Sequence, residues 1–301
     1  MSNGTSGDNR LSRNERREAA REQARTLRVE QQKKDRRNRV YLFGGLGVVV
    51  IAIIVGVALI IGSAIKPAGP GPENMASGGL QVSQGQVATT NAALPADAAL
   101  VPNPVNYANG VVDIQIYVDY LCPFCGQFEK TNSAQLKQWI ASGAATVETH
   151  PLAILDRSSM GSRYSTRSAN AASCVANFSP NNFFDYSALL FTNQPAESTE
   201  GLPDSTLKDL VGQAGVTDTA AINTCIDDTT FKNFVASATA AALRGPLPNS
   251  DVASVTGTPT VLVNGKQYSG SLTDATAFSA FVLQVGSEAA ASSTSTPAPV
   301  G

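Results

Sequence analysis

The sequence predicts an α/β fold with a helical insertion, preceded by a single transmembrane helix near the N-terminus. The first observation is an uncharged apolar run at residues 40–65. The second is a β-branched run near position 111 that passes directly into helical periodicity. The third is a long block of helical segments before a late hairpin and a last helix. This order of elements is typical of an α/β sheet that carries an inserted helical unit.

The uncharged run separates a basic segment from an acidic one. Residues 1–39 hold twelve Lys and Arg against six Asp and Glu, whereas residues 67–301 hold nine against eighteen. A helix crosses a bilayer with roughly 20 apolar residues, so the run at 40–65 is long enough. A signal peptide and a buried core helix are the alternatives, and both are usually shorter. Because Lys and Arg beside a span stay in the cytoplasm, we expect a single-pass protein of the cell membrane with an extracytoplasmic C-terminal domain.

The basic segment at 1–39 has two interpretations. A juxtamembrane cluster of Lys and Arg is attracted to anionic headgroups, which makes membrane lipid a partner of this cytoplasmic segment. A basic arm that binds nucleic acid is the alternative. We favour the first, because the cluster directly precedes the apolar run, and we expect no nucleic-acid partner.

Two further segments lack the pattern of a packed element. Residues 66–106 are rich in Pro, Gly, Ala, Ser and Asn, which predicts a flexible linker. A weak strand pattern occurs inside it at Leu80–Val87. Residues 288–301 are small, polar and Pro-bearing, so we expect a disordered tail.

The body at residues 107–287 supplies the fold, with the helical insertion at about 160–245. Strands are expected at 111–118, 146–155, 259–263 and 266–268, the last two joined by an Asn-Gly turn. Helices are expected at 124–142, 165–177, 182–192, 205–214, 220–227, 229–244 and 274–285.

Two cysteines, Cys122 and Cys125, lie where the first strand of this body passes into a helix. The first turn of a helix has unpaired N–H groups, and the helix dipole favours negative charge there. Helix N-termini and Cys-x-x-Cys spacing lower a thiol pKa from about 8.5 into the range of about 3.5–7.5. Cys122 is therefore predicted to be the exposed nucleophile, and Cys125 the thiol that resolves a mixed disulfide. Pro123 suits the first helical position, where its missing N–H would have no partner.

Two other interpretations of this pair are open. A Cys-x-x-Cys pair can be half of a zinc site, but zinc needs four ligands, and the remaining Cys and His residues are widely separated. A purely structural disulfide is the second alternative. Placement at a strand–helix junction favours redox chemistry, and we expect neither a metal nor another cofactor. The chain also has no Gly-rich phosphate loop or Ser-His-Asp arrangement that would indicate another reaction.

The segment DYLCPFC at 119–125 resembles the active-site region of membrane-anchored bacterial thiol-disulfide oxidoreductases in the DsbA-like branch of the thioredoxin superfamily. A Thr-Pro or Val-Pro loop before a late strand is the second mark of that family, and Thr258-Pro259 fits it. The resemblance covers about residues 107–287 and implies a thioredoxin-like fold. It also implies a cis Pro259 facing the cysteines and a Thr258 that offers backbone groups to a substrate peptide. Pro123 and Phe124 would support the active site between the cysteines.

The chain departs from many members of this family at two positions. They carry a buried acid six residues before the first cysteine, where this chain has Ile116. Gln115 and Asp119 are the nearest substitutes as proton relays. The dipeptide between the cysteines is Pro-Phe, whereas the best-known oxidase of the family has Pro-His. Since Phe124 cannot stabilise a thiolate as His can, we expect a less oxidising pair.

Cys174 and Cys225 both lie on expected helices of the insertion. An even leftover pair outside the cytoplasm is usually a disulfide, so we predict a structural bridge between them. Closing a loop of about fifty residues would stabilise the fold by ~4 kcal/mol in the chain-entropy model. Two buried free thiols, or a shuttle pair that passes electrons to the first two cysteines, are the alternatives.

His150, the only histidine, is expected at the end of a strand. A catalytic base is the functional interpretation, but a thiolate made by the helix dipole needs none, so we do not expect a role near the active site. Trp139 is expected in the core, and the cluster of Arg157, Arg163 and Arg167 on a solvated face.

Three functions are compatible with these patterns. The first, which we predict, is a dithiol oxidase that donates a disulfide to unfolded or reduced exported proteins. By the resemblance, a quinone-linked thiol oxidase in the membrane would reoxidise it. The second is a reductase or isomerase kept reduced by a membrane electron carrier. The third is a binding or chaperone module whose disulfide only holds the fold. The placement of the cysteines argues against the third, but a few tens of millivolts separate the first two.

Overall fold

The computed structural model describes residues 22, 33–34, 69–105, 107 and 110–294. The predicted span at 40–65 lies outside the described residues, as does most of the basic segment before it. Within the part that is described, no helix has both the length and the apolar character needed to cross a bilayer.

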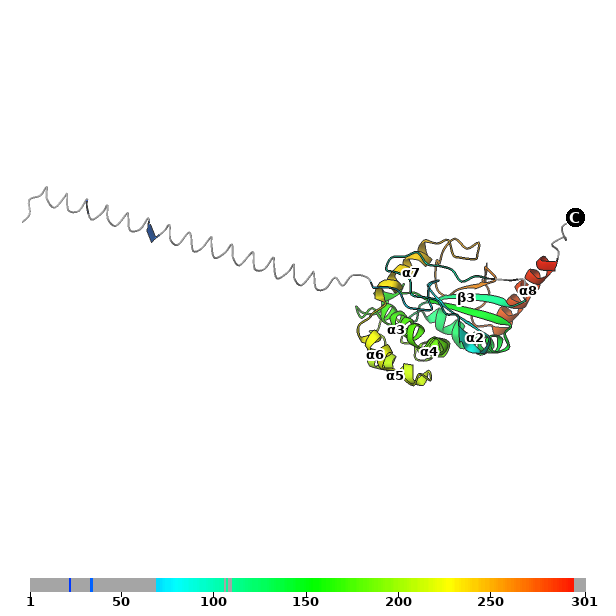
Figure 1. The fold of residues 1–301 in the computed structure, drawn as a ribbon, viewed down its shortest axis with the longest axis horizontal. Coiled ribbons are helices and arrows are strands. Elements are labelled where there is room, and N and C mark those ends of the chain that lie inside the picture. Colours follow the sequence, from blue (N-terminus) through cyan, green and yellow to red (C-terminus); the bar gives the residue numbers. More distant parts are fainter. Residues whose placement is uncertain (1–21, 23–32, 35–68, 106, 108–109, 295–301) are drawn as a thin grey trace, which may run out of the picture. The chain divides into compact units, whose positions relative to one another are not determined.

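A mixed six-stranded sheet forms the centre of the domain (Figure 1). Its strands lie in the order β2-β1-β4-β3-β5-β6. They are β1 Leu80–Ser83, β2 Val87–Ala88, β3 Val112–Val118, β4 Ala145–Pro151, β5 Thr260–Val263 and β6 Lys266–Gln267. Strands β3 and β4 pair in parallel, with Tyr117 opposite His150, and the other neighbouring strands are antiparallel. The carboxyl ends of β3 and β4 therefore meet at one edge of the sheet.

The helices of the domain are α2, the five helices of the insertion, and α8 at the C-terminal end. Helix α2, Pro123–Ser142, is the crossover that a parallel pair of strands requires between β3 and β4. The predicted insertion follows β4 and consists of α3 Tyr164–Phe178, α4 Phe183–Thr192, α5 Asp204–Gln213, α6 Ala220–Asp227 and α7 Lys232–Arg244. Helix α8, Ala275–Thr294, follows the β5–β6 hairpin. The thioredoxin-like order of elements that the sequence predicts is thus present.

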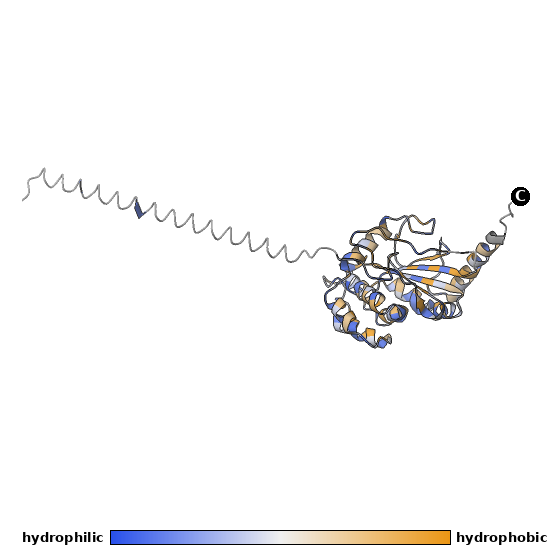
Figure 2. Cartoon of the chain, viewed as in Figure 1, coloured by the Kyte–Doolittle hydropathy of each residue, from blue (hydrophilic) through white to orange (hydrophobic). Residues whose placement is uncertain are grey.

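The two faces of the sheet pack against different elements, because successive side chains of a strand point to opposite sides. Ile114 and Ile116 of β3 belong to one core cluster with Phe128 of α2 and Phe278 of α8. Tyr117 belongs to a second cluster that includes residues of α7 and β5. Figure 2 shows the apolar character of the strands between these layers.

Residues 69–105 correct the predicted flexible linker at 66–106. Met75 is fully buried, and the side-chain amide of Asn74 donates a hydrogen bond to the carbonyl of Ala176 in α3 at 2.9 Å. Strand β1 pairs antiparallel with β4, and a short 3₁₀ turn joins β1 to β2. The many small residues of this segment allow close packing on the domain, which composition alone does not distinguish from a free linker.

The C-terminal end also differs from the prediction. Helix α8 continues to Thr294, whereas a helix to 285 and a disordered tail from 288 were expected. Glu288 forms an ion pair with Lys266 of β6, and the alanines that follow it have high helix propensity. These two effects extend the helix beyond its apolar part.

Candidate active site

Cys122 occupies the N-terminal end of α2, as the sequence predicts. It is the N-cap residue, with extended backbone angles, and Pro123 takes the first helical position. The N–H of Gly126 donates to the carbonyl of Cys122 at 3.2 Å, which begins the hydrogen-bond ladder of the helix. The Cys122 side chain therefore lies beside the free N–H groups of the first turn.

The motif hides its sulfur atoms and presents the dipeptide between them. Both cysteines are free thiols, and Cys122 is 5% exposed and Cys125 1%. Phe124 is 58% exposed, and Pro123 is exposed as well. The prediction of an exposed nucleophile is therefore wrong, because Cys122 is buried and the exposed residues of the motif are Pro123 and Phe124.

The second predicted motif lies next to the first. The Thr258–Pro259 peptide bond is cis, as the family resemblance implies. The thiol of Cys122 donates a hydrogen bond to the carbonyl oxygen of Thr258 at 3.1 Å, although the two residues are 136 positions apart. The sheet makes this contact possible, because β3 leads into Cys122 and its antiparallel neighbour β5 begins directly after Pro259.

The two thiols have opposite acidities. The side-chain hydrogen bond with Cys125 lowers the pKa of Cys122 to about 6, helped by Thr258 and the backbone N–H groups of Cys125 and Phe124 and opposed by burial. Burial raises the pKa of Cys125 well above its usual value, and the hydrogen bond and charge of Cys122 act in the same direction. One thiol is thus a thiolate at neutral pH, and the other keeps its proton.

Asp119, one of the suggested proton relays, instead fixes the end of β3. Its carboxylate accepts hydrogen bonds from the N–H groups of Leu121 at 2.9 Å, Ile154 at 2.8 Å and Leu155 at 2.9 Å, and from the hydroxyl of Ser165 at 2.8 Å. Burial raises the pKa of this carboxyl despite these bonds. Both oxygens are occupied, so the geometry favours a structural role.

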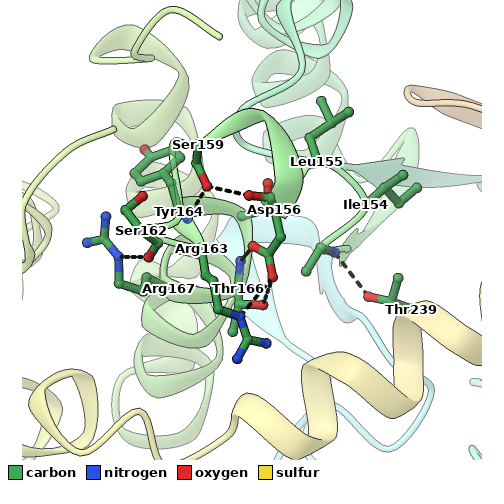
Figure 3. A network of polar contacts seen from close by, with 12 residues as sticks. Ile154, Leu155, Asp156, Ser159, Ser162, Arg163, Tyr164, Thr166, Arg167 and Thr239 are labelled. Atoms are coloured by element: carbon green, nitrogen blue, oxygen red, sulfur yellow. Dashed lines mark hydrogen bonds and ion pairs between the residues drawn. The ribbon is translucent and has the colours of Figure 1, made fainter. Parts of the chain in front are cut away.

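The loop after β4 is held in place from several sides. Asp156 accepts hydrogen bonds from the N–H of Thr166 at 2.8 Å and from its hydroxyl at 2.6 Å (Figure 3). The N–H of Ala153 donates to the hydroxyl of Thr239 in α7 at 3.0 Å. This loop supplies the Asp119 anchor, which is why β4 ends at Pro151 and not at the predicted 155.

The arginine cluster is only partly solvated. Arg167 is largely buried and forms an ion pair with Asp204 of α5 at 2.6 Å. Arg163 is exposed and contacts Asp156 at 3.3 Å. Arg167 therefore connects two helices of the insertion, which the default of a solvated face does not describe.

Gln115 and Ile116 lie away from the thiols' immediate partners. Gln115 donates a hydrogen bond to Asp113 at 3.0 Å on one face of β3, and Ile116 is part of the apolar core on the other. Among the described residues, neither side chain forms a hydrogen bond with a cysteine. A carboxyl that sequence reasoning missed is Glu129, one turn beyond Cys125, whose pKa is raised by burial to about 7.

Gln194, in the loop after α4, is a second residue that sequence reasoning missed. Its side-chain amide donates hydrogen bonds to the carbonyls of Tyr120 at 3.0 Å and Cys122 at 2.9 Å. It lies 72 residues beyond Cys122. No local pattern marks such a contact, because it arises only when the insertion packs against α2.

The other two cysteines form the predicted disulfide. Cys174 of α3 and Cys225 of α6 are bonded across a Cα–Cα distance of 5.9 Å, and both are buried. This bond joins the longest helix of the insertion to a short one. It also removes both sulfur atoms from any shared zinc site with Cys122 and Cys125.

His150 is buried near the end of β4, and a position at a strand end is what the sequence predicts. Its ring stacks on Tyr117 at 4.2 Å, and burial lowers its pKa. The two rings border a cavity of about 580 Å³ beneath α7. The cavity lining includes neither active-site cysteine, and the Tyr117 hydroxyl and His150 Nε2 are sealed from solvent. The cavity is therefore separate from the thiol chemistry. Trp139 of α2 packs against the main core, as expected.

Comparisons with known proteins agree with this geometry. A protein-family model described as thioredoxin matches residues 108–282. No protein with curated annotation matches the sequence.

Several solved structures are similar to the chain. The reduced disulfide bond oxidoreductase DsbG of Mycobacterium tuberculosis is 29% identical, with a TM-score of 0.52 over 76% of this chain and 97% of its own. Reduced DsbA of the same organism is 28% identical, with a TM-score of 0.52 over 71% of this chain and 98% of its own. Oxidised BdbD of Bacillus subtilis, at 18% identity and a TM-score of 0.50 over 74% of this chain and 100% of its own, shares the fold.

Proposed function

The chain belongs to the DsbA-like branch of the thioredoxin superfamily and is a thiol-disulfide oxidoreductase, and from this premise we propose that it introduces disulfides into reduced exported proteins. The observation that carries the proposal is the environment of Cys122. Cys122 is the N-cap residue of α2, its thiol contacts the carbonyl of Thr258, and its pKa is lowered to about 6. A stable thiolate is a good leaving group and stabilises the reduced form of the pair, which makes the corresponding disulfide a donor.

The proposed reaction begins with a disulfide between Cys122 and Cys125. A client thiolate attacks the sulfur of Cys122, and the bond to Cys125 breaks. Cys125 leaves with the electron pair and takes up a proton, as its raised pKa favours. A second client thiolate then attacks the client sulfur of the mixed disulfide and releases Cys122 as a thiolate. The client gains one disulfide, the enzyme gains two electrons, and the two sulfur atoms carry them without a cofactor.

The surroundings of the cysteines suit an unfolded client. Phe124 offers an exposed apolar surface next to Cys122. The carbonyl of Thr258 lies 3.1 Å from the Cys122 sulfur, so the Thr258 backbone is near enough to pair with an extended peptide bound there. Both contacts use features that any unfolded chain has, so they support a broad range of reduced clients.

We further propose that the reaction takes place outside the cytoplasm, on a domain anchored to the cell membrane. The uncharged run at 40–65 and the Lys and Arg before it support this topology. The Cys174–Cys225 disulfide supports an oxidising compartment. In this location a quinone-linked thiol oxidase of the membrane would reoxidise Cys122 and Cys125, and anionic lipid would contact the basic segment. A membrane-impermeant thiol reagent that fails to label the reduced cysteines of intact cells would contradict the topology.

The second candidate function is the reverse flow, in which a membrane electron carrier keeps the pair reduced for a reductase or isomerase. Phe124 is the observation that favours it, because the side chain between the cysteines cannot stabilise the thiolate by a hydrogen bond. A non-catalytic module is disfavoured, since Cys174–Cys225 provides the structural disulfide and the other two thiols are free.

The reduction potential of Cys122 and Cys125 tests the direction of flow. We expect full-length protein equilibrated with glutathione to give a value closer to the ~−120 mV of an oxidase such as DsbA than to the ~−270 mV of thioredoxin, but more negative than ~−120 mV because Phe124 replaces His. A value near the ~−270 mV of thioredoxin would indicate a reductase. In a separate assay of peptide oxidation, Cys122→Ser should reduce the rate to the uncatalysed rate while the protein stays folded. Cys125→Ser should keep a reactive Cys122 but accumulate mixed disulfides. Activity that persists in Cys122→Ser would contradict the proposal that the Cys122 sulfur forms the mixed disulfide with the client.

A further inference from the structure

Gln194 of the helical insertion contacts the backbone of the two residues that flank Leu121. Its amide nitrogen donates to the carbonyl oxygens of Tyr120 and Cys122, at 3.0 and 2.9 Å. These carbonyls belong to the last residues before α2, where the chain turns from strand to helix. One side chain thus holds both ends of a three-residue segment that carries the nucleophilic sulfur.

The contact is sterically specific. A Cβ atom at Gly126 would lie 2.2 Å from the Oε1 atom of Gln194 and 3.1 Å from its Cδ atom. Gly126 is on the first turn of α2, where Gly is less favourable than Ala by roughly 1 kcal/mol. A glycine at position 126 therefore leaves room for the Gln194 amide, which a larger residue would displace.

Neighbouring contacts fix the same segment to α4. The hydroxyl of Tyr120 donates to the hydroxyl of Ser187 at 3.0 Å, and its ring lies 5.0 Å from that of Phe191. Tyr120 is fully buried, so these contacts are shielded from water. Gln194 extends this anchorage from the Tyr120 side chain to the carbonyl of Cys122.

The position of that carbonyl determines what the sulfur atom faces. The peptide after Cys122 has no N–H because Pro123 follows, so the sulfur receives its backbone hydrogen bonds from Phe124 and Cys125 instead. Rotation of the 122–123 peptide would move the sulfur away from these two donors. The carbonyl of Cys122 accepts hydrogen bonds from the Gln194 amide at 2.9 Å and from the N–H of Gly126 at 3.2 Å, and both hold this peptide in its orientation.

We propose that Gln194 is a positioning residue of the redox site, whose amide keeps the Tyr120–Cys122 segment in the geometry that stabilises the Cys122 thiolate. The inference rests on the thiol chemistry proposed above, but on neither direction of electron flow. It assigns the insertion a role in setting the reduction potential, in addition to covering the domain.

Three variants of the full-length protein test the role of the amide. Gln194→Ala removes the donor, Gln194→Met keeps the length without it, and Gln194→Glu places a negative charge beside two carbonyls. For each we would measure the Cys122 pKa from thiolate absorbance and the potential from glutathione equilibrium. We expect Ala and Met to lower the acid dissociation constant of Cys122 about threefold, with a potential ~14 mV more negative if the exchange constant changes equally. Glu should shift both further in the same direction.

Asn193→Ala is the matched control, because the Asn193 side chain donates only to Leu189 of its own helix. It should leave the pKa and potential unchanged. Gly126→Ala is a second, independent disruption, because its methyl group displaces Gln194, and it should reproduce the shift of Gln194→Ala. In the Gln194→Ala background the same change should have little further effect, since the clash is gone.

The outcomes separate this inference from the proposed function. A melting temperature that falls in Gln194→Ala and Gln194→Met while the pKa and potential stay at wild-type values would make Gln194 a structural contact only and overturn the inference. Additive effects of Gly126→Ala and Gln194→Ala would also overturn it. If wild-type Cys122 and Cys125 did not exchange with glutathione at all, the proposed function would fail instead, and the thiolate absorbance would still report on Gln194.

Discussion

The two cysteine pairs of this chain occupy contrasting environments. Cys122 and Cys125 are three residues apart at the start of one helix, and both are free. Cys174 and Cys225 are 51 residues apart on two different helices, and they are bonded to each other. All four are buried, so exposure does not distinguish the pairs. What differs is the set of hydrogen-bond donors around their sulfur atoms.

The comparison shows how the hydrogen-bond donors around a sulfur atom decide the chemistry of a thiol. The side-chain hydrogen bond with Cys125 stabilises negative charge on Cys122 most, and the N–H groups of the first helical turn add to it. Cys174 lies within α3, where the N–H groups of the helix are already bonded to carbonyls. A thiolate there would have no such donors, and a disulfide needs none. The first pair is therefore suited to exchange and the second to joining helices.

Loss of the structural disulfide should give the largest effect on stability. The double substitution of Cys174 and Cys225 by Ala removes a bond that closes a loop of 51 residues. We expect the free energy of unfolding to fall by about 2–4 kcal/mol in denaturant titrations of the air-oxidised protein. The potential of Cys122 and Cys125 should stay within error of wild type. A shifted potential with unchanged stability would reverse the roles assigned to the two pairs.

The reactivity of Cys122 and Cys125 should depend on pH in different ways. Alkylation of Cys122 in the reduced protein should follow a pKa of about 6, with roughly nine-tenths of this thiol ionised at pH 7. Cys125 should react only at much higher pH. Mass spectrometry of the labelled peptides distinguishes the two, and equal rates at both sites would contradict the assignment.

The same shift predicts how the stability of the reduced protein depends on pH. The folded pKa of Cys122, about 6, is below its ordinary value of 9.0. The stabilisation from the thiolate is therefore complete above pH 9, is lost as pH falls toward 6, and is absent below it. Denaturant unfolding of the reduced protein relative to Cys122→Ser measures it, and a difference that did not change over this range would argue against a stabilised thiolate.

The smallest effect is expected from the residue between the two thiols. Phe124→His places a donor beside the Cys122 sulfur, so the potential should become less negative by on the order of 30 mV, a tenfold change in the exchange constant. Phe178→His is the matched control, because Phe178 is also about half exposed but lies at the end of α3. An unchanged potential in Phe124→His would remove Phe124 as a determinant of the direction of flow.

Much of the fold could be predicted because its elements carry local signals. The β-branched run of β3, the Cys-Pro start of α2 and the Asn-Gly turn before β6 each specify structure over a few residues. Residues 69–105 could not be predicted in this way. Their contacts join distant parts of the chain, as in the bond from Asn74 to Ala176, and composition records only that the segment is rich in small residues.

The candidate site divides along the same line. Cys122, Cys125, Thr258 and Pro259 lie in two short motifs, and the sheet brings these motifs together. The burial of Cys122 could not be predicted, since it depends on how the surrounding segments pack. Gln194 and the anchoring role of Asp119 also require the insertion and the loop after β4 to be in place.

The packing of residues 69–105 also limits the reach of the redox site. A free chain of this length would have an end-to-end distance of roughly 35 Å. Folded into the sheet as β1 and β2, it adds no such extension between the domain and its point of attachment. For a domain anchored as proposed, the sulfur of Cys122 searches a smaller volume near the anchor. A redox partner in the same membrane therefore meets it at a higher effective concentration, and large clients have to approach the surface.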